Sequence, residues 1–162
     1  MNITLIGMPG SGKSYIGKKL ADKLGFSLIE LDFIMESESG KQLQSVLEEL
    51  GEELFLERQE EDAIKHTIDK NNLVISPGGS IIYSSRAMEH LKHISKVIYL
   101  KTSFETIEGR IQKTPRRIVG LKEKTLQNIF DERTSLYERW ADIVINAEQD
   151  EEKLLNQLST LL

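Results

Sequence analysis

A short glycine-rich segment near the N-terminus constrains the fold more than any other feature of the sequence. Residues 7–14 read GMPGSGKS and satisfy the pattern G-x-x-x-x-G-K-[ST]. An apolar, strand-like run precedes them and a helix-like stretch follows, as this pattern requires. Glycine lets the backbone wrap so that consecutive N–H groups point inward at a helix N-terminus, where they can cradle phosphate oxygens. The segment therefore predicts a phosphate-binding loop, and its context argues against a chance glycine-rich turn.

The residue types in this loop suit a nucleoside triphosphate. We expect the Lys13 ammonium to reach the β- and γ-phosphates and the Ser14 hydroxyl to bind Mg²⁺. ATP and Mg²⁺ are therefore the expected cofactors. The loop residues expected to contact the nucleotide are Gly10, Ser11, Gly12, Lys13, Ser14 and Tyr15.

Short apolar runs alternate with longer amphipathic stretches along the whole chain, which is typical of a parallel sheet covered by helices on both faces. Because the runs are β-branched and do not alternate with polar residues, we expect strands buried on both sides. The predicted strands are Asn2–Ile6, Ser27–Leu31, Leu73–Ile75, Lys96–Leu100 and Ile143–Ile145. The predicted helices are about Lys13–Leu24, Ser45–Asp69, Ser84–Leu91, Ser103–Gln112, Glu123–Trp140 and Asp150–Leu162. The stretch Lys113–Lys124 is rich in Pro, Gly and basic residues, which predicts a mobile loop.

Composition excludes several classes of protein. The 162 residues fit one domain with an ordinary soluble composition, and no apolar run approaches the roughly 18 residues of a membrane helix. The first residues lack the basic flank of a signal peptide, so the expected location is the cytoplasm. With no cysteine, thiolate metal sites and Cys nucleophiles are excluded. The net charge of −5 argues against a general nucleic-acid binder.

The phosphate-binding loop alone does not distinguish kinases from GTPases and motor ATPases. A GTPase is expected to carry an Asn-Lys-x-Asp segment late in the chain, and residues 69–72, which read DKNN, do not match it. A motor ATPase is usually larger. The group of small-molecule and nucleotide kinases remains.

Four further segments carry a more specific resemblance. Residues 30–32 (ELD) close the second predicted strand, 51–53 (GEE) open a helix, 76–80 (SPGGS) follow the third strand, and 132–137 read ERTSLY. Together with the phosphate-binding loop, these motifs resemble those of shikimate kinases over nearly the whole chain. The resemblance implies an α/β three-layer fold with a five-stranded parallel sheet of order 2-3-1-4-5. It also implies a single domain over residues 1–162.

The same resemblance implies ATP-dependent phosphorylation of a small hydroxylated metabolite, shikimate to shikimate 3-phosphate. Asp32 would hold the acceptor hydroxyls and act as base, while Glu30 would help to place Mg²⁺ through water. Arg133 would bind the shikimate carboxylate. Arg116 would contact the transferring phosphate, and Arg110 would cover adenine. The expected partner is thus a small-molecule acceptor, with neither nucleic acid nor membrane, and a monomer is expected.

Each of these residues also has a purely structural interpretation. Asp32 could cap a helix, because Asp is common where a strand runs into a helix. Gly78 and Gly79 could form only a tight turn, although we favour close approach of their backbone to the substrate. Arg133 could pair with a neighbouring acid on its helix. The arginines of the lid, taken as residues 113–124, could be solvated charge, although a lid that closes over phosphates needs such residues.

The main departure from the family concerns a second arginine for the acceptor carboxylate, which shikimate kinases carry directly after a Phe. In the expected acceptor-binding region, residues 32–61, Phe55 is followed by Leu56, or by Glu57 if one residue is inserted. Arg58 is one or two positions away, which turns its side chain by about 100° or 200° on a helix. Arg58 is therefore a candidate substrate ligand only if the helix shifts locally. Which of the three faces the acceptor is left open.

Two smaller departures are Ser80 in place of the third glycine of a Gly-Gly-Gly turn and Arg117 in place of a lid proline. These differences keep two alternatives open. One is a kinase of this shape for a different small alcohol. The other is a non-catalytic, nucleotide-binding homologue of shikimate kinase.

Overall fold

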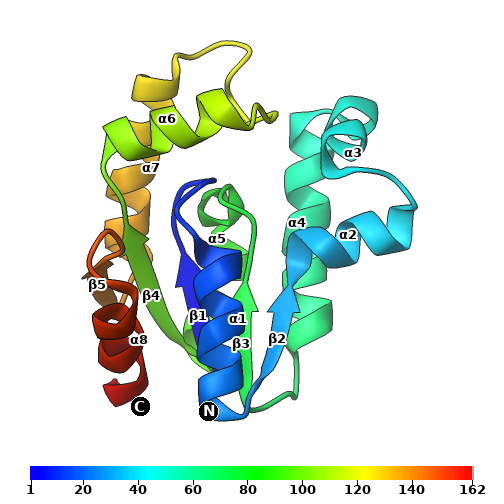
Figure 1. The fold of residues 1–162 in the computed structure, drawn as a ribbon. Helices are drawn as coiled ribbons and strands as arrows, with labels where there is room; N and C mark the ends of the chain where they lie inside the picture. The colour runs from blue at the N-terminus through cyan, green and yellow to red at the C-terminus, as the bar shows by residue number, and fades with distance from the viewer. Residues whose placement is uncertain (162) are drawn as a thin grey trace.

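The computed structural model of the chain describes residues 1–161, and within this range the strands form one parallel sheet of five (Figure 1). The spatial order is β2-β3-β1-β4-β5, which confirms the predicted order 2-3-1-4-5. In the central strand β1, Ile3 pairs with Val74 of β3 on one side and with Lys96 of β4 on the other. The strands are β1 (Ile3–Ile6), β2 (Ser27–Glu30), β3 (Leu73–Ser76), β4 (Lys96–Lys101) and β5 (Ile143–Asn146).

The helices cover both faces of the sheet. Successive residues of a strand point to opposite faces, so Leu5 packs in a cluster with α1 and α8, and Ile6 packs in a second cluster with α4, α5 and α7. The α-helices are α1 (Lys13–Leu24), α2 (Leu31–Ser39), α3 (Leu43–Leu50), α4 (Glu52–Thr67), α5 (Ser85–Ile94), α6 (Phe104–Lys113), α7 (Leu126–Trp140) and α8 (Glu151–Thr160), and a 3₁₀ turn, η1, spans Ile81–Tyr83.

The predicted helix Ser45–Asp69 is wrong as a single element. The chain instead forms α3 and α4, which meet at Gly51. Gly51 has φ +79° and ψ 167°, a conformation that L side chains rarely adopt and that ends one helix before the next begins. Helix α2 was not predicted, because strand β2 was expected to continue to Leu31, whereas Leu31 already belongs to α2.

A third apolar cluster holds these extra helices together. It joins Met35 of α2, Val46 and Leu47 of α3 and Phe55 of α4 to Val119 of the lid. In Figure 1, α2 and α3 stand beside the carboxyl ends of the strands, on the opposite side of the molecule from α6. The predicted acceptor-binding region is therefore a small helical layer packed beside the sheet.

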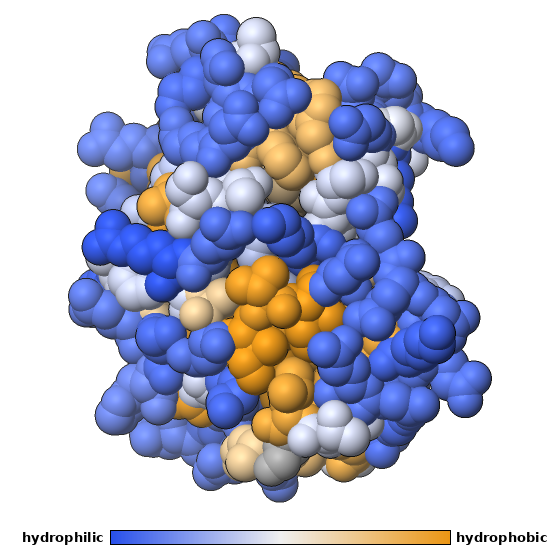
Figure 2. Space-filling view, turned by 90° about the vertical axis from the view of Figure 1, so that its left-hand side faces the viewer, coloured by the Kyte–Doolittle hydropathy of each residue, from blue (hydrophilic) through white to orange (hydrophobic). Residues whose placement is uncertain are grey.

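The opposite edge of the sheet is formed by β5. Figure 2 shows the side of the molecule on which β5 and α8 lie, where an apolar patch is surrounded by hydrophilic side chains. Val144 on β5 is 46 % exposed and is one of the large hydrophobic residues on the surface. No helix within residues 1–161 is both long and apolar enough to cross a membrane.

Candidate active site

A cavity of about 720 Å³ opens at the carboxyl ends of the central strands. The phosphate-binding loop, the start of α2, helix α4, the turn after β3, the lid and α7 all contribute to its wall. Ligands bind at this edge in open parallel α/β sheets. The predicted site residues that line the cavity are Gly10, Gly12, Lys13, Ser14, Tyr15, Glu30, Asp32, Gly78, Gly79, Arg116 and Arg133.

Lys13 begins α1 and lies almost fully inside the site. Its side chain is 8 % exposed, and Nζ donates to the carbonyl oxygens of Gly7 (2.8 Å) and Met8 (2.9 Å). Burial lowers the pKa of Lys13 to about 8, an effect that nearby Asp32 opposes and Arg116 reinforces. Because desolvation disfavours the ammonium, an anion entering the cavity would raise the pKa of Lys13 again.

Asp32 lies in the first turn of α2, but it does not cap the helix. The cap position is Glu30, and its side chain makes no capping hydrogen bond. Burial raises the pKa of the Asp32 carboxyl, Lys13 lowers it, Glu36 raises it again, and the Gln59 side chain opposes the rise. Among the described residues, Oδ1 of Asp32 has no hydrogen-bond partner although it is out of contact with solvent. A buried carboxylate oxygen without a partner is uncommon, and it faces the turn at Gly78, which makes Asp32 a candidate functional residue.

The turn after β3 needs glycine because side chains press against its backbone. A Cβ on Gly78 would lie 2.7 Å from Oδ1 of Asp32 and 2.5 Å from Nε2 of Gln59. A Cβ on Gly79 would lie 2.7 Å from Cδ of Pro9 and 3.2 Å from Nη1 of Arg133. These distances are shorter than ordinary van der Waals contacts. The two glycines thus bring α2, α4, the phosphate-binding loop and α7 together around one turn.

Arg133 projects from α7 and is only 1 % exposed. Nη2 donates to the Val119 carbonyl oxygen (3.1 Å), and Nε donates to the Tyr83 hydroxyl at a long 3.4 Å. Within residues 1–161, Nη1 has no hydrogen-bond partner. In the part of the chain that the structure describes, Arg133 pairs with neither neighbouring acid on its helix: Glu132 accepts from Lys124, and Asp131 accepts from Gln127. A buried guanidinium with an unused donor is suited to an anionic ligand.

The structure does not place Arg58 at the cavity, so its prediction as a substrate ligand is corrected. Nε of Arg58 lies 3.0 Å from both carboxylate oxygens of Asp62, and Nη2 lies 2.7 Å from Oε2 of Glu38. These partners hold the side chain on the face of α4 that meets α2. The local shift that would bring Arg58 to the acceptor is absent from the described part of the chain.

Neither Leu56 nor Glu57 lines the cavity in the described part of the chain. Leu56 packs beside the third apolar cluster, and Glu57 is exposed. Phe55 and Gln59, one helical turn apart, are the α4 residues that face the cavity. Gln59 was not predicted from the sequence, although its spacing from the apolar Phe55 puts it on the same helix face.

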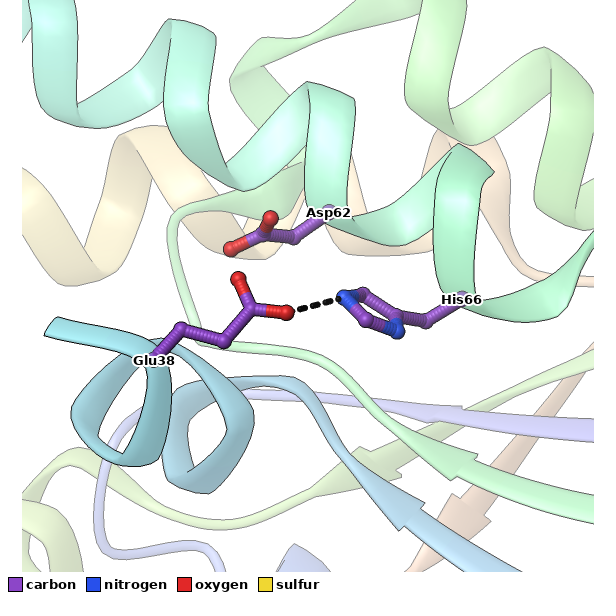
Figure 3. A group of neighbouring side chains, drawn as sticks. All are labelled: Glu38, Asp62 and His66. Carbon is purple, nitrogen blue, oxygen red and sulfur yellow. Dashed lines mark ion pairs between the residues drawn. The ribbon is translucent and has the colours of Figure 1, made fainter.

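Arg58 belongs to an ion-pair cluster that joins the end of α2 to α4. Glu38, Asp62 and His66 bring one ligand atom each to within 4.8 Å of one another, and His66 Nε2 lies 3.1 Å from Glu38 (Figure 3). Because Arg58 bonds both carboxylates, it already supplies the positive charge that a cation would bring. The cluster is therefore best described as a clamp between the two helices.

Replacing Arg58 by methionine is expected to lower the free energy of unfolding by about 1–3 kcal/mol, because Asp62 is 3 % exposed and would be left charged without its partner. Lys65→Met is the matched control, since the Lys65 ammonium is 3.7 Å from Glu38 on a mostly exposed side chain and should matter little. Denaturant unfolding measures both. Equal losses in the two variants would contradict the clamp.

The lid is packed against α3 and α4, which differs from the predicted mobile loop. Ile118 and Val119 are buried, and the Gly120 amide donates to Oε1 of Glu52 (2.9 Å). Arg117 forms an ion pair with Glu48 of α3. The composition of the segment did not predict these contacts, because burial of only two apolar residues, Ile118 and Val119, is enough to hold a mostly polar loop against the helices. Arg116 is left to line the cavity.

Three further predicted nucleotide residues lie around the loop, and two of them have hydrogen-bond partners of their own. Nη1 of Arg110 donates to the Gly10 carbonyl oxygen (2.6 Å), so Arg110 lies against the loop rather than in the cavity wall. The Tyr15 hydroxyl donates to Oε2 of Glu151 (2.8 Å) at the rim. Ser11 is buried, and its Oγ has no partner among the described residues. Ser11 is not among the residues that line the cavity in the described chain, and its Oγ faces Gly7.

The family model described as "Shikimate kinase" matches residues 9–162, which is nearly the whole chain. The chain belongs to the shikimate kinase family. It is therefore an ATP-dependent small-molecule kinase. The family assignment agrees with the resemblance carried by the motifs, and the fold is the one that the resemblance implied.

Curated shikimate kinases and solved structures of the family resemble the chain over most of its length. The shikimate kinase of Persephonella marina is 36 % identical over 148 residues, covering 91 % of this chain and 89 % of the relative. A structure described as shikimate kinase from Acinetobacter baumannii in complex with shikimate superposes with a TM-score of 0.87 and 29 % identity, covering 99 % of this chain and 91 % of that one. The structure of shikimate kinase from Aquifex aeolicus superposes with a TM-score of 0.80 and 27 % identity, covering 99 % of this chain and 95 % of that one.

Proposed function

We propose that this shikimate kinase family member transfers the γ-phosphoryl group of ATP to a hydroxyl of shikimate, giving shikimate 3-phosphate and ADP. One observation carries the proposal. Nη1 of Arg133 and Oδ1 of Asp32 are both unpartnered among the described residues and belong to residues of one cavity. A single small molecule that carries a carboxylate and a hydroxyl would satisfy a guanidinium donor and a carboxylate acceptor together.

In the proposed reaction, Asp32 orients the acceptor hydroxyl and takes its proton. The raised pKa of the Asp32 carboxyl makes it a better proton acceptor than an ordinary exposed aspartate. As the hydroxyl oxygen bonds to the γ-phosphorus, the bond from that phosphorus to the ADP oxygen breaks. Lys13 and Arg116 stabilise the charge on the transferring group. The docked lid excludes water and so limits hydrolysis of ATP.

The side chains at the loop also fit a magnesium ion. The Ser14 hydroxyl and the Glu30 carboxylate line the same cavity and offer the hard oxygen ligands that Mg²⁺ prefers. We expect Ser14 to bind the ion directly and Glu30 to hold it through water. When bound, the ion supplies charge neutralisation for the triphosphate.

The position of Arg58 supports a second candidate, a kinase for a different small alcohol. Arg58 is paired to Asp62 and Glu38. Among the described residues, the arginines of the cavity wall are then Arg133 on α7 and Arg116 and Arg117 of the lid. A carboxylate acceptor would then be held more weakly than by two arginines. A panel of hydroxylated acids and sugars, screened for acceptor-dependent ADP formation, separates the two candidates. Activity with another acceptor and none with shikimate would overturn the first.

Restoring an arginine beside the cavity is expected to improve use of shikimate. Leu56 does not line the cavity, but on α4 it is turned by only about 60° from the cavity-lining Gln59, against about 160° for Glu57. A long side chain there can reach the cavity edge, so Leu56→Arg should lower the KM for shikimate by about tenfold or more through one added charged hydrogen bond. Glu57→Arg is the matched control, because residue 57 is exposed on another face of the helix. Steady-state kinetics measures both. A larger gain from Glu57→Arg would show that the helix face is wrongly assigned.

The remaining assignments follow from the same proposal. The acceptor is a small molecule, and the compact site needs neither nucleic acid nor a membrane. Every predicted catalytic residue comes from one chain, so we propose a monomer. Because the reaction consumes ATP, we propose that the enzyme works in the cytoplasm.

A further inference from the structure

Ser80 makes a buried contact that a glycine in its place could not make. It follows Gly79 in the turn after β3 and is 5 % exposed. Its Oγ donates to Oε1 of Gln59 on α4, at 2.7 Å, and Gln59 is equally buried. The turn and the helix are therefore joined by a side-chain hydrogen bond at the wall of the cavity.

This hydrogen bond fixes which way the Gln59 amide points. Because the oxygen of the amide is engaged by Ser80, its nitrogen is directed to the other side, where Gly78 and Asp32 lie. A Cβ on Gly78 would lie 2.5 Å from Nε2 of Gln59 and 2.7 Å from Oδ1 of Asp32, so both atoms occupy the space directly beside Gly78. The reversed amide would set its oxygen against a carboxylate, which is unfavourable.

The other charged groups around Asp32 do not fix its orientation in the same way. Lys13 attracts it from the phosphate-binding loop, while Glu36 on α2 and Glu30 at the end of β2 repel it. Nζ of Lys13 donates to two backbone carbonyl oxygens of the loop, and neither acid can donate to a carboxylate when ionised. A neutral amide held in place by a third residue is the group suited to fixing the angle of the carboxylate.

We infer that Gln59, locked by Ser80, is a positioning residue: its amide packs beside Gly78 and the Asp32 carboxylate and limits the directions that the carboxylate can take, while Oδ1 keeps no hydrogen-bond partner among the described residues. Ser80 fixes the orientation of the Gln59 amide, and that amide in turn limits the orientation of Asp32. Ser80 and Gln59 touch neither phosphate nor reacting atom in this scheme. The inference rests on the proposed function, because it gives Asp32 the role of base.

Four variants test the inference in the full-length protein. Gln59→Met keeps the length of the side chain without the amide, and Ser80→Ala removes the hydroxyl. The double variant combines them. Thr67→Val is the matched control, because Thr67 is a buried polar residue at the end of the same helix, about two turns from Gln59. Its hydroxyl donates to the Ala63 carbonyl oxygen and contacts His90, and not Asp32.

Kinetics with ATP and shikimate should separate positioning from general damage. Gln59→Met is expected to lower kcat by about tenfold to a hundredfold, and Ser80→Ala by less, with KM for ATP changing less than twofold. The double variant should equal Gln59→Met, because Ser80 acts through Gln59. Losses that multiply in the double variant, or a kcat loss in Thr67→Val as large as in Gln59→Met, would overturn the inference.

Crystal structures of the wild type, Gln59→Met and Ser80→Ala supply a readout that needs no activity. We expect one conformer of the Asp32 carboxylate in the wild type and a rotated or divided carboxylate in Gln59→Met. An unmoved, single Asp32 conformer in Gln59→Met would refute the positioning role. If the wild type is inactive on shikimate but the Asp32 carboxylate still moves in the Gln59→Met structure, the proposed acceptor is refuted and the positioning role stays supported.

Discussion

Replacing Lys13 by methionine is expected to lower kcat for phosphoryl transfer by about a hundredfold to a thousandfold while the protein stays folded. Lys13 acts on charge that develops at the phosphoryl group, and the loss of one such donor from a buried site has effects of this size. The fold should survive because methionine fills the space of the lysine stem. Burial lowers the pKa of Lys13, so the ammonium is disfavoured in the ligand-free fold, and removing its charge should not destabilise the protein.

Lys19→Met is the matched control on the same helix. Lys19 forms an ion pair with Glu151 at the surface and does not line the cavity in residues 1–161. Its removal should change kcat by less than about twofold, as is usual for exposed pairs. Initial rates and circular dichroism on both variants give the comparison. Unchanged turnover in Lys13→Met, with intact secondary structure, would refute the mechanism built on the loop.

Replacing Arg133 by methionine is expected to raise the KM for shikimate by about tenfold to more than a hundredfold. The guanidinium would make a charge-assisted hydrogen bond to the acceptor carboxylate, and no second arginine from α4 shares this task in the described chain. The KM for ATP should change much less. The contrast between the two KM values distinguishes loss of the acceptor site from general loss of activity.

Arg139→Met on the same helix is the control for Arg133. Arg139 is exposed and lies over the ring of Trp140, away from the cavity wall as described. Thermal unfolding of both variants is measured beside the kinetics, because Arg133 is buried and also bonds the lid. A KM for shikimate that stays at the wild-type value in a folded Arg133→Met variant would show that Arg133 does not bind the acceptor.

The sequence could predict the parts of the fold that depend on local pattern. The phosphate-binding loop has its own signature, and the buried apolar runs predicted the five strands and, through the family resemblance, their order. Helix α2 was missed because its first residues continue the apolar character of β2. The break at Gly51 was missed because a single glycine between two helix-forming stretches is a weak signal.

The site was harder to predict where side chains are directed by contacts distant in sequence. Arg58 looked like a candidate ligand because arginine binds carboxylates, but Glu38, twenty positions earlier, holds it elsewhere. Gln59 looked unremarkable, and its importance depends on Ser80 and Gly78, which reach it only after folding. The lid was assigned from charge and proline content, and the docking of Val119 into the third apolar cluster could not be read from composition.

The hydrogen bond from Arg133 to the Val119 carbonyl oxygen gives one side chain two tasks. The same guanidinium that would hold the acceptor also holds the lid, and the lid carries Arg116 to the phosphate side of the cavity. An acceptor that orders Arg133 would then favour the closed lid, and the closed lid would favour ATP. Thermodynamic linkage makes this coupling reciprocal, so whatever factor shikimate adds to the affinity for ATP, ATP must add to the affinity for shikimate.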